Sequence, residues 1–581
     1  MVKEFLLKLI RNGFFVYLIL VLFISLHLFL VHKTFFIDAD GSMKVAIAGY
    51  GDIPFHMTQV SKFGFTDMFD LNEPLFTGEK IRYAFFINWL GGIFMRMTDS
   101  WPIALHLPTM AALIASYILI FLAYRNILGK RWAALLAVIM FMLGSGLGAW
   151  PHIKEHLLPN VFNFRPFIDY LVDNNISTVS WWKAVYPEQN ISWGGAMSLV
   201  FLHQRAFFFG LFLFSVVIYA LSRYPNFENK KWRWLAGIAL GLGPLGHYHT
   251  FLVLCLVLGF YFVISLLRKN WILVRSLLYV AVVAGVIALP QILYILSGPD
   301  PISSDNQSFI NFRLGWMVEP TIGSVKYPDG VDLNFVDKFL TYLKFLWVNF
   351  GLILPLLALS FLHKPLRRGS GLPVLWFGVL LFAFVQTVRT QPWDYDTNKI
   401  LVYFAFFASA AIIKFLISCI ERRKIIGMML LAVSFVFVIF SGVVDILPRA
   451  FVPIDKMPVI FNRDAIRTAY FIRQNVEAAD IIITSSTHLN IVSSLAGRPT
   501  IVGFPGWLWT KGVSYGAREA DLRMFYLDPV KNKNIAAKYK AQYVLIDPTI
   551  TYDWKADKKI FDNNFKLIFK AGSYYLYYLE E

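Results

Sequence analysis

The sequence predicts a polytopic α-helical membrane protein that carries a C-terminal extracytoplasmic α/β domain. Of the 581 residues, 57% are hydrophobic, and apolar runs of about 20 residues, the length that crosses a hydrocarbon core, recur along most of the chain. From about position 449 the apolar runs become short and strand-like, with charges of both signs between them. We therefore expect a transmembrane domain over 1–448 and a second domain over 449–581.

Basic clusters between the apolar runs set the expected topology. The formal net charge of +17 comes from short groups of Lys and Arg, such as those at 125–131 and 422–424, which is the pattern of cytoplasmic loops. The sequence has no basic tail and no zinc-finger or RNA-binding motif, which argues against a nucleic-acid partner. We expect a multi-pass protein of the plasma (inner) membrane, with a cytoplasmic N-terminus and the C-terminal domain outside.

The expected membrane segments begin with an anchor at Phe14–Val31, which lacks a small-residue cleavage site. The short run Tyr83–Met97, flanked by Arg82 and Arg96, is expected to lie in the outer interface, because a crossing there would place the next basic cluster outside. The other crossings are expected near 101–124, 132–149, 197–222, 232–247, 249–267, 276–297, 339–362, 372–389, 400–419 and 427–447. This gives about eleven crossings. The glycine-rich 232–249 region is a candidate broken helix.

Strands and helices alternate in the C-terminal part. Strand-like segments occupy 480–485, 499–504 and 542–547, and a closing hairpin turns at 571–573. Helical patterns lie between them, at 463–476 and 530–539. The alternation predicts a small α/β domain. About 130 residues are enough for a core of its own.

Carboxylates gather in the first outer loop, 34–100. Asp52 and His56 lie four residues apart in GYGDIPFHMTQ, so on a helix they share a face. Asp52 is a candidate general base that activates an acceptor hydroxyl, and a helix-capping role is the alternative. Asp38 and Asp40, just past the first helix, are second candidates for the base.

The polar turn TVRTQPWDYDTNK (387–399) between two apolar helices is a second candidate site. Arg389 and Lys399 are candidates to hold a lipid phosphate. Asp394 and Asp396 are candidates to contact sugar hydroxyls or a divalent metal, whose requirement the sequence leaves open. The alternative is a belt of interfacial residues without a chemical role.

Other candidate substrate contacts lie near the outer ends of the helices and in the C-terminal domain. Arg205 stands among phenylalanines and needs an anionic partner, either a phosphate or an internal carboxylate. His247 and His249 are candidate ligands, with packed core histidines as the alternative. Trp507 and Trp509 lie in a turn punctuated by Gly and Pro, where they would stack on a sugar or pack the domain onto the membrane surface.

The segment NEPLFTGEKIRYAFFINWLGGIFMRM, with the leading helix, the acidic loop and the α/β domain, resembles the GT-C superfamily of membrane glycosyltransferases. The likeness is strongest from Asp52 through Tyr83 to Arg131 and is architectural beyond. It implies inverting transfer of a sugar from a polyprenyl-phosphate-linked donor to a glycan, lipid or protein acceptor outside the cell, with Asp52 as the loop acid that serves the acceptor. Ile53 stands where the family often has a second acid, and the WWDYG motif of oligosaccharyltransferase subunits has no match.

Other functions remain open alternatives. A polymerase or ligase of lipid-linked glycans would use a similar scaffold with a cationic site for diphosphate. A lipid-linked sugar transporter or flippase would usually show internal repeats and paired broken helices, and no convincing repeat occurs in the sequence. A non-catalytic assembly scaffold would tolerate Asp52→Asn, whereas a transferase that uses this base would not.

Overall fold

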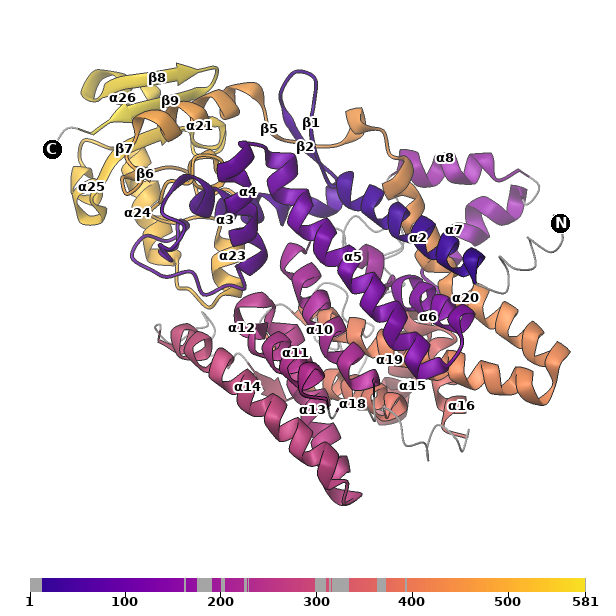
Figure 1. The fold of residues 1–581 in the computed structure, drawn as a ribbon. Coiled ribbons are helices and arrows are strands. Elements are labelled where there is room, and N and C mark those ends of the chain that lie inside the picture. Colours follow the sequence, from indigo (N-terminus) through magenta and orange to yellow (C-terminus); the bar gives the residue numbers. More distant parts are fainter. Residues whose placement is uncertain are drawn as a thin grey trace, which may run out of the picture.

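The structure is a computed structural model that describes residues 13–160, 163–174, 191–199, 204–223, 227, 229–297, 310–312, 315, 334–362, 373–391 and 394–579. Figure 1 shows a large body of long helices with a smaller α/β part at one end, where the chain finishes. The predicted fold class, a polytopic helical membrane protein with a C-terminal part built on a sheet, is confirmed.

Seven helices among the described residues are long and apolar enough to cross a membrane. They are α2 (Phe14–His32), α5 (Trp101–Leu128), α10 (Arg205–Ser222), α13 (Tyr248–Leu267), α14 (Trp271–Leu296), α19 (Asn398–Arg422, with its preceding turn) and α20 (Lys424–Phe451). Shorter helices occupy the remaining expected crossings: α6 (Arg131–Leu143), α11 (Lys230–Gly241), α18 (Val374–Thr387) and the pair α15 (Phe335–Phe350) and α16 (Ile353–Ser360). The number of eleven crossings stays a prediction.

Two of the expected crossings are interrupted. The predicted break in the 232–249 region is confirmed, because α11 ends at Gly241 and a single turn, α12 (Gly243–Gly246), follows before α13. The crossing expected near 339–362 stays a prediction, and the structure adds a break there, because α15 and α16 meet at an angle of 96°. Gly351, between them, has a φ of 49°, a left-handed conformation that ends α15 and that glycine adopts without steric cost.

Short helices and strands complete the transmembrane half. They are α7 (Trp150–His152), α8 (Arg165–Asp173), α9 (Ala196–Leu199), β3 (Asn311–Phe312) and β4 (Val388–Arg389). The helix expected at 83–97 is α4 (Phe86–Thr98), and it packs against α3 (Ile53–Phe65) and α5. A Cβ atom at Gly92 of α4 would lie 2.5 Å from the Cβ of Phe63, so this close helix crossing requires glycine. The interfacial orientation of α4 stays a prediction.

The C-terminal sheet has the order β6 (Ile481–Ile483), β7 (Ala541–Ile546), β9 (Tyr574–Tyr578), β8 (Lys566–Ala571), with β6 parallel to β7 and the other pairs antiparallel. Its helices are α21 (Arg463–Asn475), α22 (Ile491–Ser494), α23 (Pro505–Thr510), α24 (Gly516–Leu527), α25 (Lys533–Tyr539) and α26 (Lys558–Asn564). The predicted strands at 480–485 and 542–547 and the closing hairpin are confirmed.

The strand predicted at 499–504 is wrong. Only Thr500 pairs with the sheet, in an isolated bridge to Ile482. The backbone of this segment bonds instead to the first loop: Thr500 N–H donates to Pro74 O at 2.9 Å, and Gly503 N–H donates to Leu75 O at 2.6 Å. A tertiary partner has therefore taken the hydrogen bonds that a fifth strand would use.

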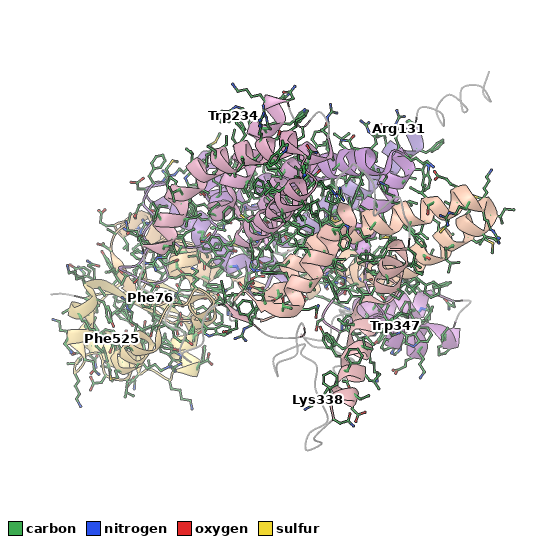
Figure 2. All side chains as sticks on the ribbon, turned by 90° about the horizontal axis from the view of Figure 1, so that it is seen from below. Phe76, Arg131, Trp234, Lys338, Trp347 and Phe525 are labelled. Atoms are coloured by element: carbon green, nitrogen blue, oxygen red, sulfur yellow. The ribbon has the colours of Figure 1, made fainter. Side chains whose placement is uncertain are left out.

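The first loop and the C-terminal part share their hydrophobic cores, and we call residues 35–85 and 454–579 together the α/β body. Strand β2 (Met43–Val45) lies between β1 (Phe35–Ile37) and β5 (Val459–Phe461), so one sheet joins both ends of the chain. Met57 of α3 packs in one core with Ile472 of α21. In a second core, Phe76 packs with Phe525 of α24, and Figure 2 shows these two residues at the same end of the molecule. The domain boundary near 448 stays a prediction.

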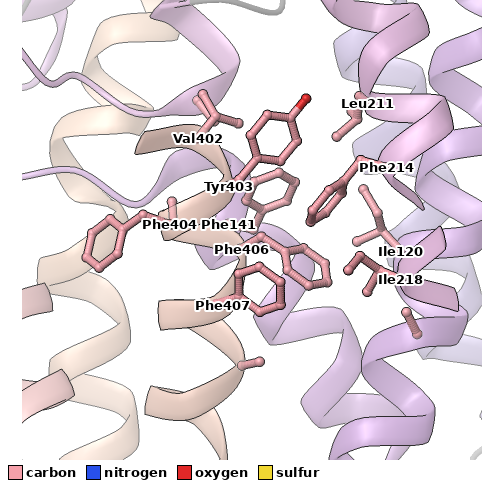
Figure 3. Packing of buried hydrophobic residues seen from close by; sticks show 14 of the residues in the cluster. Ile120, Phe141, Leu211, Phe214, Ile218, Val402, Tyr403, Phe404, Phe406 and Phe407 are labelled. Atoms are coloured by element: carbon pink, nitrogen blue, oxygen red, sulfur yellow. The ribbon is translucent and has the colours of Figure 1, made fainter. Parts of the chain in front are cut away.

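Aromatic packing fixes the start of α19 against α10. Figure 3 shows Tyr403, Phe406 and Phe407 of α19 pointing toward Phe214 of α10 and Phe141 of α6. The ring centroids of Phe214 and Tyr403 are 4.5 Å apart, and those of Phe141 and Phe406 are 5.6 Å apart. Each such pair stabilises the packing by about 0.5–1.5 kcal/mol beyond the burial of its area. The polar residues that precede α10 and begin α19 are held at fixed positions as a result.

Candidate active site

Asp52 stands at the N-cap of α3 but does not cap it. Its side chain makes no capping hydrogen bond to the helix backbone. Instead, Oδ2 accepts a hydrogen bond of 2.9 Å from Nε2 of Gln204, the N-cap residue of α10. The capping alternative is therefore wrong for this side chain, which is directed across to another helix start.

The environment of Asp52 moves its titration toward neutral pH. Burial raises the pKa of Asp52 to about 6, and the charge of Asp396 acts in the same direction, while Lys399 and the Gln204 hydrogen bond act against it. The residue as a whole keeps a partly exposed surface, although its carboxyl group is buried. A carboxylate with a pKa close to the working pH is suited to general-base catalysis.

Lys399 and Asp396 form an ion pair at the start of α19. Lys399 Nζ lies 3.0 Å from Asp396 Oδ2, and the two side chains are 13% and 23% exposed. The charges of Lys399 and Asp396 both shift the pKa of Asp52. The structure thus brings the predicted residues Asp52, Asp396 and Lys399 together from segments that are hundreds of residues apart.

The two predicted histidines take different roles at the start of α13. His247 is the N-cap of this helix: its Nδ1 accepts from the Thr250 N–H at 3.3 Å, and the Thr250 hydroxyl lies 2.8 Å from the same atom. The His249 ring lies 5.4 Å from the His247 ring and makes no hydrogen bond within the described part of the chain. The charge of Lys399 acts on His249. His247 is built into the helix cap, whereas His249 is available beside the lysine.

Arg205 and His56 belong to one buried network. The Arg205 guanidinium donates to Asn88 Oδ1 and Ala104 O, both at 2.9 Å, and to Thr109 Oγ1 at 3.3 Å. The Arg205 backbone N–H donates to His56 Nε2 at 3.3 Å. These acceptors are neutral, and no carboxylate of the described residues forms an ion pair with Arg205. The network holds the start of α10, and with it Gln204, against α3.

An aromatic wall covers the start of α3. The Tyr83 ring lies 4.8 Å from Phe55 and 6.5 Å from His56. Burial raises the pKa of the Tyr83 phenol, and the charges of Asp52 and Asp396 raise it further, which reflects how near those carboxylates are. On the other side of Phe55, the predicted sugar platform residue Trp507 lies at 5.3 Å. Trp507 therefore belongs to the wall of the site.

Sequence reasoning missed Tyr83 and Gln204 as site residues. Tyr83 lies in the segment that resembles the GT-C superfamily, and Gln204 is the polar neighbour of Arg205 in a phenylalanine-rich run. The sequence context of both residues is visible, but it does not show which contact either side chain makes.

The second base candidates lie in the turn of the β1–β2 hairpin. Asp38 pairs with Lys44 at 2.6 Å, and this hydrogen bond lowers the pKa of Asp38. Asp40 accepts from the backbone N–H of Ser42 at 2.8 Å and from its hydroxyl at 2.6 Å. Neither carboxylate is among the charges that act on Asp52. The structure does not bring these two residues into the Asp52 cluster.

Two more predicted residues, Arg389 and Trp509, lie on other elements, and a third falls outside the described side chains. Arg389 is buried in β4, where its backbone pairs with Asn311. Trp509 lies on α23, two positions after Trp507, and is partly exposed. The side chain of Asp394 lies outside the described part of the structure.

Two of the candidate metal ligands, Asp52 and Asp396, have other partners in the described part of the chain. Within the residues that the structure describes, no group of three or more His, Cys, Asp or Glu side chains is arranged to hold a metal ion. Asp396 is paired with Lys399, and Asp52 with the Gln204 amide. A cation, a titratable carboxylate and hydrogen-bonding groups remain as the chemistry of the cluster.

No protein-family model and no curated protein matches the sequence. Similar solved structures include ArnT from Cupriavidus metallidurans bound to undecaprenyl phosphate, at 11% identity and a TM-score of 0.47, covering 97% of each chain. Archaeal oligosaccharyltransferase AglB from Archaeoglobus fulgidus, in complex with an inhibitory peptide and a dolichol-phosphate, has 11% identity and a TM-score of 0.47, covering 96% of this chain and 73% of that one. At 11% identity the likeness concerns only the path of the backbone, and it identifies neither functional residues nor a reaction.

Proposed function

We propose that the chain is an inverting glycosyltransferase that moves a sugar from a polyprenyl-phosphate-linked donor to an acceptor outside the cell. One observation carries the proposal: Asp52, a titratable carboxylate held by Gln204, lies within electrostatic reach of the Lys399–Asp396 pair. This arrangement supplies a base for an acceptor hydroxyl and a cation for a leaving phosphate. The α/β body then lies on the outer face of the inner membrane, as the basic clusters of the sequence predict.

In the proposed step, the acceptor hydroxyl oxygen attacks the anomeric carbon of the donor sugar from the face opposite the phosphate. The new C–O bond forms as the bond between the anomeric carbon and the phosphate oxygen breaks, and the electron pair of that bond leaves with the polyprenyl phosphate. The hydroxyl proton passes to the Asp52 carboxylate. Attack and departure on opposite faces invert the anomeric configuration.

The leaving phosphate gains negative charge in this step, and Lys399 is the residue that we assign to it. A fixed cation placed where charge develops lowers the barrier, and the ion pair with Asp396 orients the Lys399 ammonium. His249, beside Lys399, is the second phosphate contact, and Arg389, earlier in the same turn, is the third. Arg205 and His56 act as positioning residues through the network that holds Gln204.

Polar atoms around the start of α19 support a sugar ligand at the same place. Buried side-chain atoms without a hydrogen-bond partner are rare in proteins and call for a ligand, a water molecule or an ion. Several atoms without a partner among the described residues occur in the turn beside Asp396 and Lys399: Thr390 Oγ1, Gln391 Nε2, Thr397 Oγ1 and Asn398 Oδ1. We assign them to the hydroxyl groups of the donor sugar.

The proposal is tested with the full chain in lipid nanodiscs and a panel of radiolabelled polyprenyl-phosphate sugars. We expect the wild type to remove label from the lipid and Asp52→Asn to do so at least about 100-fold more slowly. Asp67→Asn is the matched control, because Asp67 is an exposed carboxylate of the same loop that accepts only from the backbone N–H of Phe69. If the wild type consumes no donor, the proposal is wrong, and a leaflet-translocation assay tests the flippase alternative. Equal consumption by wild type and Asp52→Asn would move the base to another carboxylate.

A further inference from the structure

Polar residues gather where two parallel strands of the C-terminal sheet end. Thr484 follows the last residue of β6, and Asp547 follows the last residue of β7. Because β6 and β7 run parallel, their carboxyl ends meet at the same edge of the sheet. Open α/β sheets bind their ligands just outside the carboxyl ends of such strands.

Three side-chain atoms after β6 are buried without a hydrogen-bond partner among the described residues: Thr484 Oγ1, His488 Nε2 and Ser493 Oγ. The neighbouring hydroxyl of Ser485 is satisfied, because it donates to the buried carboxylate of Asp547. A buried polar atom without a partner lowers stability, so three of them within one short segment need an explanation.

The segments that carry Thr484 and Ser493 pack in one core. Ile482 of β6 belongs to the same core as Val492 of α22. Thr484 follows two residues after Ile482, and Ser493 directly follows Val492.

His488 connects this polar set to the loop that carries Asp52. Its ring lies 4.8 Å from the ring of Tyr50, which is two positions before Asp52, and 5.5 Å from Phe504. The Phe504 ring lies 5.3 Å from Trp507, a residue of the aromatic wall at the start of α3. His488 is therefore joined through Phe504 to the aromatic wall beside Asp52.

The chemistry of the set is neutral and able both to donate and to accept. Burial lowers the pKa of His488, so its imidazole is uncharged at neutral pH. Two hydroxyls and a neutral imidazole match the hydroxyl groups of a polyol. None of the three is a cation, as a phosphate ligand would require, and aromatic rings beside them suit the apolar faces of a sugar ring. Tyr50, partly exposed between Gly49 and Gly51, is the aromatic side chain beside His488.

We propose that Thr484, His488 and Ser493 form an acceptor subsite that binds the hydroxyl groups of a neutral glycan end, with Tyr50 and Trp507 against the sugar ring. The subsite rests on the proposed transfer reaction, in which it would present one acceptor hydroxyl to Asp52. It adds the chemical class of the acceptor, an uncharged glycan.

Binding is measured directly, without a donor. The probes are neutral methyl glycosides and short oligosaccharides, with inorganic phosphate as the anionic probe, titrated into the full chain in nanodiscs and followed by saturation-transfer NMR. We expect at least one glycoside to bind the wild type, and its affinity to fall about tenfold in Thr484→Val and in His488→Phe, which each remove hydrogen bonds but keep a similar shape. Unchanged affinity in both variants, binding of phosphate alone, or no glycoside binding to the wild type would each overturn the subsite.

Thermal melting separates a ligand site from a buried water. Thr484→Val and Ser493→Ala remove hydroxyls without a protein partner, so we expect an unchanged or higher Tm, whereas Ser485→Ala removes a partnered hydroxyl and lowers it. A Tm loss in Thr484→Val equal to that in Ser485→Ala would show that a bound water satisfies Thr484, which overturns the proposal. In the transfer assay, the subsite variants raise the KM for the acceptor and leave kcat near wild type, while Asp52→Asn lowers kcat. A wild type that consumes no donor refutes the transfer reaction, and the glycoside titration still decides whether the subsite exists.

Discussion

Gln204 Nε2 donates a hydrogen bond of 2.9 Å to Asp52 Oδ2 across 152 positions of the sequence. The bond joins the N-cap residues of two helices, α10 in the membrane half and α3 in the α/β body. It favours the ionised form of a carboxyl group that burial would otherwise keep protonated to higher pH. The proton affinity of Asp52 is therefore set partly by the helix opposite.

The first prediction concerns the pH dependence of Gln204→Leu. Asp52 has to be deprotonated to act as a base, so wild-type activity should rise with pH through about 6, the pKa of Asp52. Loss of the Gln204 hydrogen bond removes a stabilising contact to the carboxylate and raises that pKa. We expect the acid limb of kcat/KM to move upward by about 0.5–1 pH unit. An acid limb that does not move would mean that Asp52 is not the group whose titration controls the activity.

The second prediction concerns the stability of Asp52→Asn. The folded-state pKa of Asp52 is raised to about 6, above the ordinary value of 3.8 for an aspartate, so the ionised carboxylate lowers the free energy of unfolding at pH 7.5. This loss disappears as the pH falls through 6 toward 4. We expect Asp52→Asn to raise the free energy of unfolding at pH 7.5 by at most about 2 kcal/mol, because partial exposure reduces the effect.

Melting curves of the detergent-solubilised protein at pH 7.5 and pH 4 test this difference. At pH 4 the variant and the wild type should unfold at nearly the same temperature. If Asp52→Asn is less stable than the wild type at pH 7.5, the carboxylate stabilises the fold. A residue that serves catalysis usually lowers the stability of the protein instead.

The third prediction concerns the cation at the start of α19. Lys399→Met removes the charge assigned to the leaving phosphate, so kcat should fall by about 10²–10³-fold, while Lys399→Arg should keep part of the activity. Lys44→Met is the matched control, because Lys44 pairs with Asp38 in the β1–β2 hairpin. Radiolabel release from the donor measures all three variants. Equal losses in Lys399→Met and Lys44→Met would exclude a specific role for Lys399.

The fourth prediction concerns the ion pair between Glu73 of the first loop and Lys511 of the C-terminal part. Their atoms lie 2.9 Å apart, and the side chains are only 4% and 12% exposed. Glu73→Gln leaves the lysine charge buried without its partner, which should lower the free energy of unfolding by about 3–5 kcal/mol. The double variant Glu73→Gln/Lys511→Met should recover part of this loss.

The exposed pair Lys456–Asp173 provides the control, because its side chains are 48% and 62% exposed. Breaking that pair should change the free energy of unfolding by less than about 1 kcal/mol. Denaturant titrations of the four proteins make the comparison. Similar losses of unfolding free energy for the buried and the exposed pair would contradict a specific role of the Glu73–Lys511 pair in joining the first loop to the C-terminal part.

Much of the fold and part of the site could be predicted from local pattern. The apolar runs predicted the positions of the seven long apolar helices, and the alternation of strand-like and helical segments predicted β6, β7 and the closing hairpin. Asp52, Asp396 and Lys399 stand out because charges at the ends of apolar helices are costly unless they are used. Gln204 and Tyr83 could not be assigned, because their roles depend on which helix start lies opposite, and no local pattern contains that information.

The wrong strand prediction at 499–504 and the break within 339–362 have the same origin. Residues 499–504 have the composition of a strand, but their backbone bonds to Pro74 and Leu75 of a loop that is distant in sequence. The run 339–362 is apolar enough for one helix, but Gly351 turns the chain through a left-handed conformation. In both places tertiary contacts or a single residue override the average preference of the segment.

The core shared by the two ends of the chain has a consequence for biosynthesis. The apolar face of α3, with Ile53, Met57 and Val60, leaves the ribosome early, whereas α21 and α22, which bury it, are made last. Through most of translation this face has no partner, and exposed apolar surface of that kind invites association with other chains. The α/β body therefore folds as one late event. A nonsense mutation after α20 would abolish the folded site at Asp52 as well as the C-terminal sheet.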